Sequence, residues 1–521
     1  MITPERLADE LNLLQIHKEL QESILRDIAR RLVKTDFSVT DTAAWQAEKL
    51  QQSGMLYKEI VTEIAKRTKK SDEEITAAFE DVKTEVFEFD ESDAPPELPK
   101  EFKAMSPAMK NVITAALKKT KKEVRNLTGT TAVTSQNSFI RACDLAHQQI
   151  VSGAFSYGEA IKNAIKSAAK DGVTVVYPSG YISSLDAAVR RAVLTGTAQT
   201  TGKLVEMRAK ESKEDLMQLS AHSGARPDHA EWQGKIVSLS GRKGYLTLED
   251  IGYGEVTGFL GANCRHTWFI FYEGYTKPAY TEEQLEAFRN ETVTYDGEVI
   301  PIRQALDRQR NMERSIRRSK QQLVMFDEAM KNAIEPEEKI LWEQEFNNAA
   351  VKLKSKEAKL KDFCEKTTLK RDRNREQVFA AETENGIKAW GKSVSQKAVQ
   401  ANKIELTKLE NKRIIKEIKL CGLKGEINLK PKAVDLSDYS FDNYHMNKER
   451  SHNITRKDAE SFVKNAKITE TTWKGKFVKY ISQTGATYLN VEEKSIRTAF
   501  FREEFGKKFE RALEVLKRYG R

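Results

Sequence analysis

Apolar residues recur at helical spacing in the first part of the chain, as in the stretch 24–32, where charged residues separate them. The pattern predicts short helices over 41–54 and 57–67. A further helix is expected from Ser71, where Ser-Asp-Glu-Glu resembles a capping box. Residues 90–99 (DESDAPPELP) concentrate three prolines among acidic residues, which predicts a linker or a sharp break.

Helical spacing resumes over 101–170. The polar segment 126–138 (NLTGTTAVTSQNS) contains Gly and several Thr residues, so we expect it to interrupt this helix as a loop. Residues 185–211 predict another helix, with Gly196 and Gly202 weakening its middle.

The clearest long helices are predicted over 303–375. One apolar stripe runs from Ile316 to Ala333, and Pro336 can begin a second helix because proline is tolerated in a first turn. We therefore expect two antiparallel helices joined near Glu335 and Pro336. The favoured interpretation is a helical hairpin packed on its own chain. The alternative is an arm that contacts a partner or DNA, although the basic run 308–320 is typical of a solvated helix face.

The last part of the chain changes from a mixed, basic stretch over 376–430, interpreted as a tether, to a compact α+β unit over 431–521. Strands are expected over 471–482 and 486–491, separated by a Gln-Thr-Gly turn. A final helix is expected over 502–519.

The predicted fold class is therefore multidomain, mainly α with α+β domains. Its expected parts are a helical N-terminal region (1–95), an α+β middle domain (100–300), the helical hairpin (303–375), the basic tether (376–430) and the small C-terminal α+β domain (431–521).

Composition narrows the class of protein. With 39% hydrophobic and 31% charged residues, the chain is expected to fold as a soluble protein rather than stay disordered. No run of about 18 apolar residues occurs, so we expect no membrane partner, and the N-terminus lacks the apolar core of a signal peptide. The four cysteines are scattered with no CxxC pair, which suits synthesis in a reducing cytoplasm. A net charge of +10 permits contact with nucleic acid without requiring it.

Residues 215–275 hold three of the seven histidines among many glycines, and here we expect specific geometry. His222, His229, Cys264 and His266 are potential zinc ligands, since neutral imidazole and thiolate suit that metal. Their spacing is not that of a standard zinc finger. The favoured interpretation is that the histidines and Arg226 hydrogen-bond to loop backbone, so no cofactor is expected and zinc remains the alternative.

Three segments of this region resemble a known family: 221–235 (AHSGARPDHAEWQGK), 252–258 (GYGEVTG) and 261–274 (GANCRHTWFIFYEG). They resemble the phage minor capsid protein 2 family and, more loosely, Mu F-type head morphogenesis proteins, over roughly residues 1–300. The motif positions are His222, Arg226, Asp228, His229, Trp232, Gly234, Cys264, Arg265 and His266. The resemblance implies a structural protein of the phage head, located near the portal, with portal and head proteins as partners and a role in head assembly or DNA packaging and delivery.

The C-terminal unit is similar to a second family. Residues 443–458 (NYHMNKERSHNITRKD), 480–488 (YISQTGATY) and 495–500 (SIRTAF) resemble the phage nuclease domains grouped with barnase, EndoU, colicin E5/D and RelE. The resemblance implies a metal-independent RNase. Histidine can act as base or acid near neutral pH, and arginine binds phosphate in a fork. The candidate catalytic residues are His445, Arg450, His452, Lys476, Tyr480, Arg497 and Thr498. The alternative is a degenerate binding domain whose histidines only cap and pack.

Three functions follow. The favoured one is a structural virion protein of the head that carries an RNase-like tail. The second is an RNase or toxin effector delivered with the virion. The third is a DNA-binding head protein that uses the basic stretches 308–320 and 388–413, for which binding would depend steeply on salt.

Overall fold

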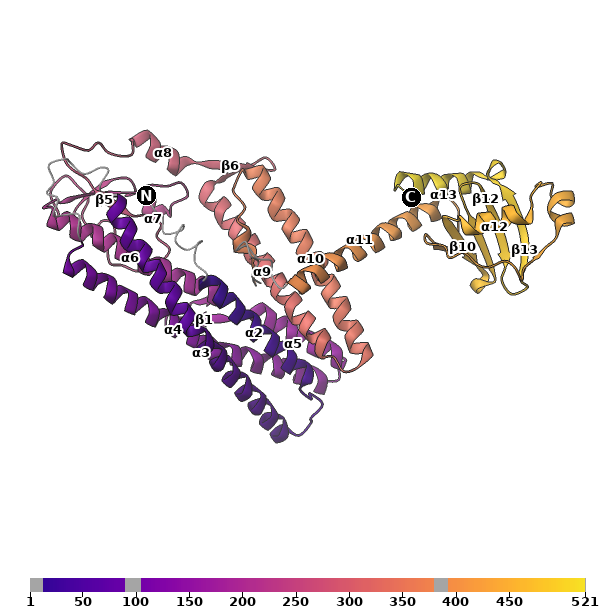
Figure 1. Ribbon diagram of the computed structural model, residues 1–521, viewed down its shortest axis with the longest axis horizontal. Helices are drawn as coiled ribbons and strands as arrows, with labels where there is room; N and C mark the ends of the chain where they lie inside the picture. The colour runs from indigo at the N-terminus through magenta and orange to yellow at the C-terminus, as the bar shows by residue number, and fades with distance from the viewer. Residues whose placement is uncertain (1–12, 90–104, 379–391, 521) are drawn as a thin grey trace. The chain divides into compact units, whose positions relative to one another are not determined.

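The computed structural model describes residues 13–89, 105–378 and 392–520 (Figure 1). It divides into two compact units, Met1–Ala401 and Asn402–Arg521. The chain is mainly helical, with four small sheets among the described residues. The predicted linker at 90–99 lies outside the described residues, and the finer five-part division of the chain stays a prediction.

The first unit is a body of long helices around one large apolar core. Helix α2 packs on α9, α3 packs on α4, and α4 packs on both α5 and α6. The bounds are α2 (Leu13–Lys34), α3 (Thr42–Phe89), α4 (Pro107–Val151), α5 (Tyr157–Asp171), α6 (Leu185–Glu211), α9 (Ile302–Asn332) and α10 (Pro336–Thr367). Among the described residues, no helix is both long enough and apolar enough to cross a membrane.

Two expectations for the N-terminal helices were wrong. Helix α3 runs without a break through the positions predicted as separate short helices. Helix α4 runs through 126–138, which was predicted as a loop. In α4 the hydroxyl groups of Thr128 and Thr131 donate to the carbonyls of Val124 and Thr128 within the helix. These side chains are buried, so short polar residues fill a tight helix interface instead of ending the helix.

The prediction of a helix over 185–211 is confirmed by α6. Its two glycines allow close packing. A Cβ atom on Gly196 would lie 2.3 Å from Thr120 Oγ1 of α4, and one on Gly202 would lie 2.1 Å from Leu260 Cδ1. The carbonyl of Gly202 also accepts a hydrogen bond from Trp268 Nε1 at 2.9 Å. Glycine therefore lets α6 approach α4 and the glycine-rich loops closely.

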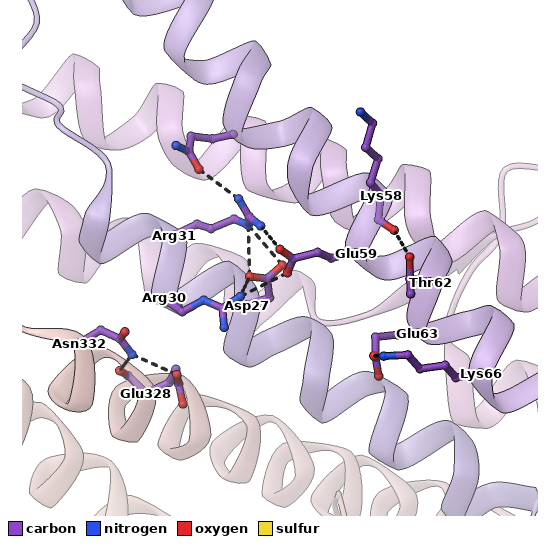
Figure 2. Close-up of polar contacts among 11 residues, drawn as sticks. Asp27, Arg30, Arg31, Lys58, Glu59, Thr62, Glu63, Lys66, Glu328 and Asn332 are labelled. Atoms are coloured by element: carbon purple, nitrogen blue, oxygen red, sulfur yellow. Dashed lines mark hydrogen bonds and ion pairs between the residues drawn. The ribbon is translucent and has the colours of Figure 1, made fainter.

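A partly buried ion network joins α2 to α3 (Figure 2). Arg31 Nε lies 3.1 Å from Asp27 Oδ1, and Arg31 Nη2 lies 2.9 Å from Glu59 Oε1. The Arg31 side chain is only 7% exposed, and Arg30 pairs with the same aspartate. A shielded network of this kind fixes the register between two helices, because breaking one pair leaves a buried charge without its partner.

The predicted helical pair is present as α9 and α10, which lie side by side and antiparallel (Figure 1). Helix α9 also packs on α2 and α5, so the pair docks on its own unit. Cations of the basic run have internal partners. Arg308 pairs with Glu298 at 2.7 Å, Arg317 with Asp186 at 2.7 Å, and Lys320 donates to the Glu376 carbonyl at 3.0 Å. Much of the positive charge of residues 308–320 is therefore paired within the protein itself.

Small sheets and short helices surround the middle of the first unit. They are β1 (Thr174–Val176) with β2 (Ile182–Ser184), β3 (Leu216–Leu219) with β4 (Ile236–Ser238) and β5 (Trp268–Ile270), β6 (Thr292–Tyr295) with β7 (Glu298–Pro301), α7 (Pro227–Ala230), α8 (Glu282–Asn290) and η2 (Arg373–Glu376).

The second unit is an α+β fold around one six-stranded sheet of order β8-β10-β11-β12-β13-β9. Neighbouring strands are antiparallel except β13 and β9. The elements are the end of α11 (Lys392–Leu420), β8 (Glu426–Asn428), β9 (Ser440–Phe441), η3 (His445–Glu449), α12 (Arg456–Lys464), β10 (Ile468–Thr472), η4 (Trp473–Gly475), β11 (Phe477–Ile481), β12 (Gly485–Asn490), β13 (Ser495–Phe501), η5 (Arg502–Glu504) and α13 (Lys507–Arg518). The single strand expected over 471–482 was wrong, because η4 divides it into β10 and β11.

Helices cover both faces of this sheet. One core joins α13 to Ile481 and Ala486, and we call that side the α13 face. The other core joins α12 to Tyr480 and Leu489, and we call that side the α12 face. Successive residues of a strand point to opposite faces, so the register assigns each candidate residue on a strand to one side.

Candidate functional site

The β4-β3-β5 sheet brings the glycine-rich segments of the first unit together. Strand β3 is central, and Leu219 of β3 pairs with Trp268 of β5. Beyond this pair, Ser220 N donates to the Thr267 carbonyl at 2.8 Å. The segment after β3, which carries His222 and His229, therefore lies beside the segment before β5, which carries Cys264 and His266.

Three of the four predicted metal-ligand candidates meet at one point. His229 Nδ1 lies 3.4 Å from His266 Nδ1, and Cys264 Sγ lies 3.6 Å from the same His266 atom. All three candidate ligand atoms lie within 4.8 Å of one another, and all three residues are buried. The fourth candidate, His222, stacks its ring on His266 with centroids 4.5 Å apart.

The outer nitrogens of both histidines meet oxygen acceptors. His229 Nε2 lies 2.9 Å from the Thr257 carbonyl oxygen, and His266 Nε2 lies 3.2 Å from Gln233 Oε1. Gln233 Oε1 also accepts the His222 backbone N–H at 3.1 Å. The Arg226 guanidinium donates to the Thr257 carbonyl and contacts His229 Nε2. His222 Nδ1 also lies 2.9 Å from the Ser223 carbonyl oxygen, so contacts from motif residues to loop backbone are present for His222, His229 and Arg226.

The surroundings disfavour the charged forms of these groups. Burial, together with the nearby histidines and the cations Arg226 and Arg265, lowers the pKa of His266 to about 2. Burial also lowers the pKa of His229 and raises the pKa of the Cys264 thiol. The ring centroid of Trp232 lies 4.5 Å from that of His229 and 4.8 Å from that of His266. The indole therefore forms an apolar wall beside both imidazoles.

The remaining motif residues shape the loops. Asp228 is largely exposed and lies 3.5 Å from Arg226 Nε. Gly234 has φ +75, where a side chain would be strained, and its Cβ would lie 2.5 Å from Leu285 Cδ2. Sequence reasoning missed Gln233 and Thr257. Gln233 stands inside the AEWQGK string and could have been singled out, whereas Thr257 acts through its backbone carbonyl and left no signal in the sequence.

In the second unit the structure brings His452 and Thr498 together. His452 Nε2 lies 3.1 Å from Thr498 Oγ1, and His452 Nδ1 lies 2.7 Å from Glu504 Oε2. The His452 side chain is 14% exposed, so it remains reachable from solvent. Glu504, on η5, was missed because the sequence gives no reason to join it to a histidine 52 residues earlier.

Two predicted cations lie around Phe477, which alternation along β11 places on the α13 face with Ile481. Strand pairing opposes Tyr488 to Thr498, and a bulge between Tyr488 and Leu489 brings Arg497 to the same side. The Arg497 guanidinium lies 5.0 Å from the Phe477 ring centroid, and Lys476 Nζ lies 5.8 Å from it. Lys476 also pairs with Glu492 at 2.8 Å.

The other candidates lie elsewhere. Tyr480 is buried in the core of the α12 face, opposite Thr498, and its hydroxyl donates a long 3.4 Å bond to the Lys432 carbonyl. His445 pairs with Glu449 at 2.6 Å on η3. Arg450 is exposed where η3 ends.

Lys479 was not predicted, although it occupies the α13 face beside Tyr488. Its Nζ pairs with the buried Glu470 at 2.7 Å and lies 5.2 Å from the Tyr488 ring centroid. Alternation along β11 would have placed Lys479 and Tyr480 on opposite faces, and this signal was available in the sequence.

Comparison with known proteins identifies the family. The profile of "Phage minor capsid protein 2" matches residues 2–365. A "Structural protein" of Lactococcus phage LL-H is 30% identical over 173 residues, which is 31% of this chain and 43% of the relative. The matched part thus spans less than half of that relative's length, and no solved structure matches. The chain belongs to the phage minor capsid protein 2 family.

Proposed function

We propose that this protein is a minor component of the head of a tailed phage, located near the portal, and that it acts in head morphogenesis or in DNA packaging and delivery. The observation that carries the proposal is the family match over residues 2–365, which covers most of the first compact unit. The match to a structural protein of another phage supports a place in the particle. Its partners are then the portal and head proteins.

The test is a phage whose gene for this chain carries a premature stop codon. The proposal expects lysates with few DNA-filled, infectious heads, and rescue when the full chain is supplied from a plasmid. Electron microscopy and packaged-DNA content separate an assembly defect from a packaging defect. Normal heads with a full DNA content and normal infectivity would overturn the proposal.

A second activity is favoured by one specific observation, the contacts of His452 with Glu504 and Thr498. In this arrangement His452 Nδ1–H donates to the Glu504 carboxylate, which leaves Nε2 as an acceptor. The Thr498 hydroxyl donates to Nε2 in the resting protein. A 2′-hydroxyl of RNA in the same position would give its proton to Nε2, so His452 is the candidate general base.

The cations of the α13 face and solvent supply the rest of the chemistry. The 2′-oxygen attacks phosphorus as the bond from phosphorus to the 5′-oxygen breaks, and the leaving 5′-oxygen takes a proton from water. Arg497 and Lys476 lie around Phe477 on the side of the sheet that carries Thr498. Guanidinium and ammonium groups would stabilise the negative charge that develops on phosphate during cleavage. Exposed Arg450 is a further candidate phosphate contact. We therefore propose metal-independent RNA cleavage as the activity of the second unit.

Full-length protein is incubated with end-labelled RNA in EDTA. Wild type is expected to cleave, and His452→Ala is expected to lose about 100-fold or more of the rate, the usual contribution of a general base. Tyr480→Phe is the matched control, because Tyr480 lies on the opposite face and should keep nearly full activity. No cleavage by folded wild type, or equal cleavage by His452→Ala, would overturn this second proposal.

A further inference from the structure

We propose that His229, His266 and Cys264 form a metal site that binds one zinc ion in the first unit. The site is separate from the RNase candidate in the second unit, and it does not depend on the role of the protein in the head. The ligands would be His229 Nδ1, His266 Nδ1 and Cys264 Sγ, which face one another in the cluster. The donor set is two imidazoles and one thiolate, a combination that suits zinc and other late transition metals rather than magnesium or calcium.

Two of the three donor separations match a tetrahedral ion, and the third pair, His229 and Cys264, lies within 4.8 Å and would close on metal binding. Ordinary zinc bonds of about 2.0–2.1 Å to nitrogen and about 2.3 Å to sulfur place two nitrogens about 3.3 Å apart, and a nitrogen and a sulfur about 3.6 Å apart. The observed separations are 3.4 Å between the two Nδ1 atoms and 3.6 Å between His266 Nδ1 and Cys264 Sγ. Three protein ligands leave the fourth position for a water molecule.

Hydrogen bonding around the site determines which nitrogens carry protons. Gln233 Oε1 accepts the His222 backbone N–H, so this atom is an acceptor and His266 Nε2 must donate to it. The Arg226 guanidinium, which can only donate, also contacts His229 Nε2. When His229 Nε2–H instead donates to the Thr257 carbonyl at 2.9 Å, His229 Nδ1 carries no proton. Both Nδ1 atoms then present lone pairs to each other across 3.4 Å. A cation between them removes this repulsion.

The metal-free alternative is a proton shared by the two Nδ1 atoms. That arrangement would move the His229 proton from Nε2 to Nδ1. The His229 Nε2 lone pair would then accept from Arg226 but would face the Thr257 carbonyl oxygen at 2.9 Å, a contact between two acceptors. With a metal on Nδ1, His229 Nε2–H donates to the Thr257 carbonyl, and Arg226, which lies against Nε2, directs its own N–H to the same carbonyl. Metal-ligating histidines commonly donate their other ring N–H to a carbonyl or amide oxygen, as both histidines do here.

The position of the site indicates what the metal would do. It joins His229 of the short helix α7 to the segment that precedes β5, two loop-rich parts of the region around the β4-β3-β5 sheet. Trp232 and Phe259 pack around it with ring centroids 5.8 Å apart. A metal that binds the folded state and not the unfolded chain stabilises this region by mass action.

The test measures metal in full-length protein purified without chelators from zinc-containing medium. Elemental analysis is expected to find about one zinc per chain. Cys264→Ser and His266→Ala are expected to hold less than about a tenth of that amount. Cys143→Ser is the matched control, since Cys143 is a buried free cysteine of α4 and should leave the zinc content unchanged.

A second measurement needs no variant. Cobalt(II) substituted into the wild-type protein should give the visible bands of a tetrahedral site and a sulfur-to-cobalt charge-transfer band, and Cys143→Ser should give the same spectrum. Folded wild type that holds no zinc or cobalt would overturn the proposal, as would Cys264→Ser with the metal content and charge-transfer band of wild type. Neither result bears on head assembly or RNA cleavage, so failure here is distinguishable from failure of the proposed functions.

Discussion

Substitution of Asp327 tests whether the helical pair is anchored by a buried charge. Asp327 lies on α9 and its side chain is 0% exposed. Its carboxylate lies 2.6 Å from Lys331 Nζ, 2.6 Å from Lys397 Nζ on α11 and 3.5 Å from Arg26 Nη1 on α2. One carboxylate therefore ties three helices of the first unit. Burial acts to raise the pKa of Asp327, but the two lysines offset this effect and hold the pKa below its usual value.

The expected cost of Asp327→Asn follows from these contacts. Removing one partner from a fully buried ion pair costs about 3–5 kcal/mol. Here the Lys331 and Lys397 side chains remain 46% and 43% exposed, so water compensates part of the loss and the asparagine oxygen keeps one acceptor. We expect the free energy of unfolding of the first unit to fall by about 2 kcal/mol. With a urea dependence of about 3 kcal/mol per molar, the midpoint falls by about 0.7 M.

Tryptophan fluorescence during urea unfolding provides the assay. Five of the six tryptophans lie in Met1–Ala401, so the signal reports chiefly on the first unit. Glu365→Gln is the matched control, because Glu365 and its partner Lys361 on α10 are 65% and 64% exposed. Removing this surface charge should change stability by less than about 0.5 kcal/mol.

The pH dependence of unfolding gives a second test of the contribution of Asp327 to stability. A carboxylate with a lowered folded-state pKa contributes stability above its unfolded pKa of about 3.9, and this contribution is lost as pH falls through the folded pKa. The difference between wild type and Asp327→Asn should therefore be constant from neutral pH to about pH 5 and shrink below about pH 4. Equal free energies of unfolding for Asp327→Asn and Glu365→Gln at pH 7 would show that the contacts of Asp327 do not stabilise the first unit.

Other substitutions give further predictions. Gly129→Ala on α4 should stabilise the first unit by about 1 kcal/mol in urea unfolding, because a Cβ there meets nothing within 4 Å and alanine favours a helix. Gly196→Ala on α6 should instead destabilise it by about 1–3 kcal/mol, since the new Cβ would lie 2.3 Å from Thr120 Oγ1; stabilisation by both would contradict the packing. Glu504→Gln should lower kcat for RNA cleavage at least about tenfold with little change in KM, because Glu504 orients His452; an unchanged kcat would remove that role.

Apolar periodicity in the sequence correctly predicted two helical parts of the first unit. The helix over 185–211 and the pair joined at Glu335 and Pro336 follow from apolar spacing and from a proline that begins a helix. The segment 126–138 failed because its Thr, Ser and Gly residues have low intrinsic helix propensity. Burial against neighbouring helices, with Thr128 bonded to Val124, overrides that preference, and only the tertiary structure shows this.

The sequence likewise located some residues of the candidate sites and missed others. The unusual string around His229 and the Cys-x-His segment located the first cluster, but the orientation of each ring depends on Thr257 and Gln233, which only the fold brings close. In the second unit, His452 and Thr498 were singled out together with Tyr480. Strand alternation separates Tyr480 from them, and the contact with Glu504 depends on how η5 follows the last long strand.

The most direct test of the central claim is quantitative mass spectrometry of purified phage particles separated into heads and tails. A structural role in the head predicts this protein in the head fraction, in a fixed copy number far below that of the major capsid protein and retained when the tails are removed. Its absence from purified particles, or its presence only in the tail fraction, would contradict a structural role in the head.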